Sequence, residues 1–167
     1  CTPPESLLAW LTSSTLLIPK LESDIGPAHV QVLNHYVDAS NWWEQSHLRL
    51  VSNVCRRDIE VHQDTRTCWF ARSIFPELTW LRHQSILSAL GTYNLGEVLS
   101  RFANDIKKIH QHYYAITPQH EQWYWLASIK KYPNASIVWV KSSIFSIQNQ
   151  CEFYLYEILY PEFHTLL

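Results

Sequence analysis

Two alternating runs within residues 55–76, CRRDIEVHQDTRTCWFARSIFP, restrict the fold of this chain more than any other feature. Alternation of polar and apolar residues indicates β-strands with one buried face, and the polar sequence HQDTRT between the runs is typical of a hairpin turn. Arg57 falls on the same face as Ile59, and Arg72 falls on the same face as Phe70. The sequence therefore predicts a β-hairpin that carries an arginine on the apolar side of each strand.

The two arginines raise a question of charge. If the turn is centred on Asp64 and Thr65, Arg57 stands directly opposite Arg72, and like charges in that arrangement destabilise a sheet. An anion between them would remove the repulsion, because a guanidinium group binds a carboxylate or phosphate through two hydrogen bonds. In the alternative, a turn one residue longer breaks the register and both side chains extend to water. The hairpin alone does not separate these interpretations.

Composition limits the classes of function. Of the 167 residues, 47% are hydrophobic and 17% are charged, and the net charge is −2. These values exclude a disordered chain and a polyanion-binding surface, so we expect neither nucleic acid nor an anionic membrane as a partner. The length suits a single domain over residues 1–167, and we expect a monomer.

The cysteines and the N-terminal sequence bear on the compartment. The four cysteines form no CxxC pair and no metal-ligand spacing, which is typical of reduced thiols, and we expect no bound metal. No apolar stretch approaches the length of a membrane span, and CTPPESLLAW lacks the regions of a signal peptide. We therefore expect a cytoplasmic protein.

Segments with a strand pattern lie towards both ends of the chain, and helical segments lie between them. A short helix is expected from Glu5. Strand patterns occupy residues 29–37, 47–55, 55–76, 136–147 and 151–161. Helical spacing occupies residues 82–90 and 95–116. Because strands and helices do not alternate as βαβ units, the sequence predicts the α+β class with a mainly antiparallel sheet.

The last strand pattern contains a single acid on its apolar face. Glu157 shares that face with Phe153, Leu155 and Leu159. A carboxylate in that position must pair with a cation or keep its proton, because burial of an unpaired charge is costly. Glu157 is therefore a candidate site residue, and the alternative is a structural ion pair with one of the hairpin arginines.

In order and spacing, these positions resemble the bacterial chorismate pyruvate-lyases, which make 4-hydroxybenzoate for ubiquinone synthesis. The resemblance consists of a helix that ends in Trp10-Leu11, Arg57-Asp58-Ile59 followed by Ala71-Arg72 and Pro76, LGTYNLGEVL at 90–99, and Glu157-Ile158-Leu159-Tyr160-Pro161. It implies one antiparallel sheet with helices covering one face. It also implies a cofactor-free lyase that removes pyruvate from chorismate.

The resemblance also implies roles for individual residues. Arg57 resembles the arginine that binds the ring carboxylate, and Arg72 resembles a second arginine of the site. Glu157 resembles the active-site acid, so that Glu157 and Arg57 would be the catalytic residues. Leu95 resembles a residue whose backbone contacts the ligand, and Leu17 is placed in the ligand-contacting segment after the first helix.

Two departures from the family keep other functions open. Lys141-Ser142 stands where the family has a pair of arginines, so another aromatic carboxylate is an alternative ligand. Residues 100–135 are longer than in the family, which would fit an altered lid over the site. They include His110 and His112, for which a metal pair lacks a third ligand, and surface or core packing is the expected role. The alternative function is a non-catalytic sensor domain for a small aromatic carboxylate.

Overall fold

The computed structural model describes residues 1–91, 93–129 and 131–167. Thr92, within the 90–99 motif, and Lys130 lie outside the described residues. The strands are β1 (Ala28–Ala39), β2 (Asn53–Gln63), β3 (Arg66–Pro76), β4 (Ile106–Ile116), β5 (Val138–Ile147) and β6 (Cys151–Leu159). The helices are α1 (Glu5–Leu11), α2 (Leu17–Asp24), α3 (Trp42–Leu48), α4 (Glu77–Arg82), α5 (Gln84–Leu87), η1 (Ser88–Gly91), α6 (Leu95–Arg101), α7 (Glu121–Trp125), η2 (Leu126–Ile129) and α8 (Pro161–His164).

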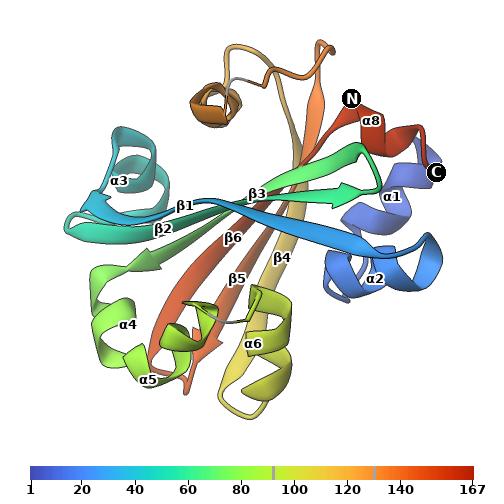
Figure 1. Ribbon diagram of the computed structural model, residues 1–167. Helices are drawn as coiled ribbons and strands as arrows, with labels where there is room; N and C mark the ends of the chain where they lie inside the picture. The colour runs from blue at the N-terminus through green and yellow to red at the C-terminus, as the bar shows by residue number, and fades with distance from the viewer. Residues whose placement is uncertain (92, 130) are drawn as a thin grey trace.

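The strands form one antiparallel sheet in the order β1-β2-β3-β6-β5-β4 (Figure 1). The hairpins β2–β3 and β5–β6 lie side by side at its centre because β3 pairs with β6. Strands β1 and β4 form the two edges. The predicted class, α+β with a single mainly antiparallel sheet, is confirmed.

Each face of the sheet carries its own apolar core, because side chains alternate between the faces along every strand. Face A is the face that carries Ile59 and Leu155, and it packs against α1, α2, α5, α6 and α8. Face B is the face that carries Phe70 and Ile158, and it packs against α3 and α7. Figure 1 shows α6 and α7 on opposite sides of the sheet. The helices on face A match the predicted cover, and α3 and α7 are additional.

Several predicted element boundaries were wrong. The helix expected over 95–116 ends at Arg101, and residues 106–116 form the edge strand β4. Residues 47–55 were expected to be extended, but α3 continues to Leu48 and β2 begins at Asn53. In β4, tertiary pairing overrides the local pattern, since its backbone bonds along the whole of β5. In contrast, α3 begins at a local capping box formed by Asn41 and Glu44. Among the described residues, no helix is long and apolar enough to cross a membrane.

Candidate functional site

Four of the five predicted site residues line one cavity on face A. Arg57 comes from β2, Glu157 from β6, Leu17 from α2 and Leu95 from α6. The cavity has a volume of about 30 Å³, and most of its lining is apolar. The other lining residues are Leu16, Ile18, Pro19, Ile59, Trp69, Ala71, Ser73, Gly96 and Leu155. The roles of these residues in binding stay predictions.

A β-bulge in the first hairpin changes the register that the sequence predicted. The turn lies at Asp64 and Thr65, as expected. However, Val61 pairs with Trp69, whereas the next residue, His62, pairs with Thr67. Cys68 therefore has no partner in β2 and is an extra residue in β3. Such a residue shifts the register by one, and a shift by one sends every later side chain to the other face.

The bulge separates the two arginines. Arg57 pairs with Ser73, and Arg72 pairs with Asp58. Arg57 therefore stays on face A, whereas Arg72 lies on face B. The prediction that both arginines share one face and one ligand is wrong for Arg72. The alternative, with both side chains extending to water, is also wrong because both are buried.

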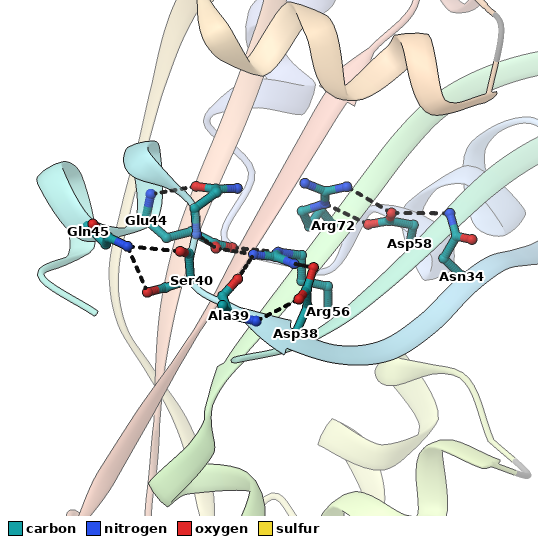
Figure 2. A network of polar contacts seen from close by, with 10 residues as sticks. Asn34, Asp38, Ala39, Ser40, Glu44, Gln45, Arg56, Asp58 and Arg72 are labelled. Atoms are coloured by element: carbon teal, nitrogen blue, oxygen red, sulfur yellow. Dashed lines mark hydrogen bonds and ion pairs between the residues drawn. The ribbon is translucent and has the colours of Figure 1, made fainter. Parts of the chain in front are cut away.

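Arg72 is neutralised within the protein. Its Nε donates to Asp58 Oδ1 at 2.7 Å and its Nη2 donates to Asp58 Oδ2 at 2.9 Å (Figure 2). Asn34 Nδ2 lies 3.5 Å from the same Asp58 Oδ2, and the guanidinium stacks 4.4 Å from the ring centroid of Trp125. A buried bidentate pair of this kind is structural, because each charge compensates the other.

A second buried ion pair on face B was not found from the sequence. Arg56 Nε donates to Glu44 Oε2 at 2.8 Å, and its Nη2 donates to Glu44 Oε1 and to the Ala39 carbonyl oxygen (Figure 2). Glu44 also closes a capping box with Asn41 at the start of α3. The pair ties α3 to β2. The only signal was the position of Arg56 on an otherwise buried strand.

Arg57 differs from both arginines on face B. It is 3% exposed, and no acidic side chain pairs with it among the described residues. Its Nε is buried without a hydrogen-bond partner in the same part of the chain. Burial lowers the pKa of Arg57, although a guanidinium stays charged in proteins. Its cross-strand neighbour His35 adds no negative charge, and the pKa of His35 is lowered first by burial and then by Arg57.

Glu157 lies in the same cavity beside two lysines. It is 7% exposed, and burial raises its pKa to about 7, while Lys141 and Lys108 act in the opposite direction. Lys141 is its direct partner across β5 and β6. Burial lowers the pKa of Lys141 to about 8, although Glu157 partly opposes this shift. Glu157 is therefore a carboxyl group that changes charge near neutral pH. It forms no structural ion pair with an arginine among the described residues.

The two lysines fasten the segment that precedes α2. Lys141 Nζ donates to the carbonyl oxygens of Ser13 at 2.8 Å and Thr15 at 3.2 Å. Lys108 Nζ donates to the Ser14 carbonyl oxygen at 3.1 Å. Lys141 stands where the chorismate pyruvate-lyases have one arginine of a pair, so the sequence comparison had already indicated this position. Its contacts show that it supports the wall of the cavity.

No protein-family model matches the sequence, and no curated protein matches it. Among solved structures, PhnF from Mycobacterium smegmatis is similar, with a TM-score of 0.59 and 8% identity over 90% of this chain and 65% of that chain. A GntR-family transcriptional regulator from Bacillus cereus has a TM-score of 0.57 and 8% identity, over 81% of this chain and 92% of that chain. The possible transcriptional regulator YydK from Bacillus subtilis has a TM-score of 0.51 and 11% identity, over 81% of this chain and 60% of that chain. At such identities the likeness shows the fold, and this chain spans less than two thirds of PhnF and YydK.

These findings correct the predicted function. The similar structures from Bacillus cereus and Bacillus subtilis are those of a transcriptional regulator and a possible one, so the prediction of a chorismate pyruvate-lyase, with its place in ubiquinone synthesis, is wrong. The exclusion of a nucleic-acid partner and the choice of chorismate and 4-hydroxybenzoate as partners are not supported for the same reason. The prediction failed for a physical reason. A cavity with a buried arginine and a buried acid can bind a ligand without converting it, so these residues alone do not indicate an enzyme. The fold is similar to that of the effector domain of PhnF from Mycobacterium smegmatis, with a TM-score of 0.53 at 10% identity.

Proposed function

We propose that residues 1–167 form a single ligand-binding effector domain of a transcription regulator. The domain binds a small anionic molecule in the cavity on face A and does not convert it. DNA binding belongs to a part of the regulator outside these residues. The likeness to regulator structures supports this proposal, and Arg57 provides the observation that carries it.

Arg57 carries the proposal because no acidic side chain compensates its charge in the part of the chain that the structure describes. A buried cation without an acidic partner lowers stability, since neither water nor a counter-ion compensates it. Proteins retain such groups mainly at functional sites, where the ligand supplies the missing partner. The guanidinium can form two hydrogen bonds to a carboxylate or phosphate, and apolar side chains nearby can contact the rest of the ligand. Leu17 and Leu95 form part of this apolar contact.

A binding and turnover experiment separates a sensor from an enzyme. We expect an aromatic carboxylate such as benzoate to bind at millimolar or lower concentration and to raise the melting temperature. Chorismate incubated with the protein should release no pyruvate above the spontaneous rate. Steady pyruvate release that is lost in Arg57→Met would overturn the sensor assignment.

Binding of an anion should weaken as the pH rises from 6.5 to 7.5. Glu157, with a pKa of about 7, loses its proton over this range and places a negative charge in the cavity. If only the protonated form accepts the anion, the affinity falls by about threefold. The pKa of His35 is lowered, first by burial and then by Arg57, which opposes a positive charge on this ring. The Arg57 Nε–H resonance, followed in benzoate titrations at the two pH values, measures the effect at this cavity, and Glu157→Gln should abolish it; a pH dependence of this resonance that persists in the variant would contradict the role of Glu157.

Access to the cavity requires movement of the helices that line it. A volume of about 30 Å³ is too small for an aromatic acid, so α2 and α6 must shift outward when a ligand binds. No residue of 100–129 or 131–135 lines the cavity, so the proposal does not rely on a lid in that segment. Hydrogen exchange should therefore show ligand protection in residues 17–24 and 95–101, with little change in β4. Protection confined to β4 would contradict this arrangement.

A further inference from the structure

A second pocket lies on face B, across the sheet from the cavity that contains Arg57. Four of the nine histidines line it: His47 at the end of α3, His110 and His112 on β4, and His120 at the start of α7. We call it the histidine pocket. Its volume is about 350 Å³, within the usual range for small-molecule sites. It shares no lining residue with the cavity on face A.

Backbone contacts orient two of the imidazoles. The backbone N–H of Gln122 donates to His120 Nδ1 at 3.1 Å, so the neutral ring carries its proton on Nε2. His47 Nδ1 lies 3.2 Å from the Trp43 carbonyl oxygen, to which it donates in the matching tautomer. Neither Nε2 atom has a hydrogen-bond partner within the described residues. Both rings therefore have a free nitrogen for a ligand.

The lining contains no carboxylate. Burial lowers the pKa of His112 and His120, and their respective neighbours His110 and His47 lower it further. At neutral pH the rings of His112 and His120 are therefore largely uncharged, and a positive charge on the neighbouring ring opposes their protonation. A negatively charged ligand would relieve both effects, because it replaces lost solvation and offsets the repulsion.

Other titratable groups around the pocket do not reverse this preference. Tyr114 and Tyr156 are neutral, because burial raises the pKa of each hydroxyl far above neutral pH. Glu44, which acts on Tyr156 from α3, is paired with Arg56. Besides the imidazoles, the groups on the elements that surround the pocket are thus neutral phenols and a compensated acid.

A metal ion fits the arrangement poorly. Among residues 1–91, 93–129 and 131–167, no three histidine, cysteine or acidic side chains are placed to hold one. In addition, the Nδ1 atoms of His47 and His120 are engaged with the backbone. The available groups are instead mostly hydrogen-bond donors or groups that become donors on protonation. The indole N–H of Trp43, which also lines the pocket, is buried without a partner in the described residues.

Aromatic surfaces complete the pocket. The ring of Trp43 stacks on His47 with centroids 5.0 Å apart, and His112 stacks on Tyr114 with centroids 5.4 Å apart. Planar surfaces of this kind favour an aromatic ligand body. We propose that the histidine pocket is a second ligand site, which binds a small anion, preferably one with an aromatic ring. Binding is accompanied by proton uptake on the imidazoles.

The test uses benzoate and inorganic phosphate as probes, in the Arg57→Met variant. This background removes the guanidinium group on which the proposed function rests, so the outcome does not depend on the proposed function. We expect binding of benzoate to be about tenfold tighter at pH 6 than at pH 8, because a single coupled proton changes affinity by up to tenfold per pH unit. Imidazole resonances of His112 and His120 should shift during the titration. Phosphate binding with the same affinity would show that the anion alone suffices.

Substitutions decide whether the pocket is responsible. His112→Gln and His120→Gln should each weaken benzoate binding at pH 6 by fivefold or more and reduce its pH dependence, whereas the exposed control His29→Gln should not. Circular dichroism and the melting temperature establish that each variant is folded, and either variant alone is sufficient for the test. Undetectable binding at pH 6, or unchanged affinity in a folded His112→Gln or His120→Gln variant, would overturn the proposal.

Discussion

Arg57→Met should lose most of the affinity of the cavity on face A for anionic ligands and should be no less stable than the unmodified protein. Loss of hydrogen bonds to a charged group costs about 1.5–3 kcal/mol, which corresponds to roughly 10- to 150-fold in affinity. Stability should stay the same or rise, because the variant replaces a buried and unpaired cation by an apolar side chain of similar length. Calorimetry with benzoate at pH 6.5 and urea denaturation measure the two effects.

Arg57→Lys provides the matched control for charge. An ammonium group keeps the charge but cannot form the two parallel hydrogen bonds of a guanidinium, so this variant should also bind weakly. Affinity that is unchanged in both folded variants would remove Arg57 from the ligand site. A large loss of stability in Arg57→Met would instead indicate an internal partner for this side chain.

Arg72→Met should have the opposite effect, although both arginines are buried in the same hairpin. The substitution leaves Asp58 on face B without its bidentate partner, and removal of one member of a buried pair costs about 3–5 kcal/mol. Affinity per folded molecule should be unchanged, because Arg72 lies across the sheet from the cavity. Urea denaturation at neutral pH measures the loss.

The double variant Asp58→Leu with Arg72→Met tests the cause of that loss. Replacement of both charges by apolar groups leaves no buried charge unpaired, so most of the stability should return. If Arg72→Met is as stable as the unmodified protein, the ion pair contributes little. If it is stable but fails to bind anions, Arg72 belongs to the ligand site after all.

Local patterns predicted much of the fold. The helix from Glu5 and the two last strands were recognised because their periodicity agrees with their tertiary environment. β4 was missed because its apolar residues continue the helical spacing of α6, and only pairing with β5 decides the strand. The bulge at Cys68 left no recognisable signal, since one extra residue in a strand changes neither its composition nor its alternation.

The site was predicted more completely than its purpose. As expected, one cavity brings together Arg57, Glu157, Leu17 and Leu95, because the side chain of each lies on the buried side of its helix or strand. Arg72 was misplaced by the single residue of the bulge. Whether such a cavity binds or converts its ligand depends on how the ligand is placed against these side chains, and the sequence does not show the ligand. The same residues therefore supported both the lyase and the sensor.

The most direct test of the account follows the Nε–H resonances of the seven arginines in an NMR titration with benzoate. Arg57 Nε lacks a partner in the described residues, whereas the Nε atoms of Arg56 and Arg72 donate to Glu44 and Asp58. The account predicts that the Arg57 resonance shifts with benzoate concentration while those of Arg56 and Arg72 stay in place. Saturable binding at pH 6.5 that leaves the Arg57 resonance unmoved, or that shifts Arg72 instead, would contradict it.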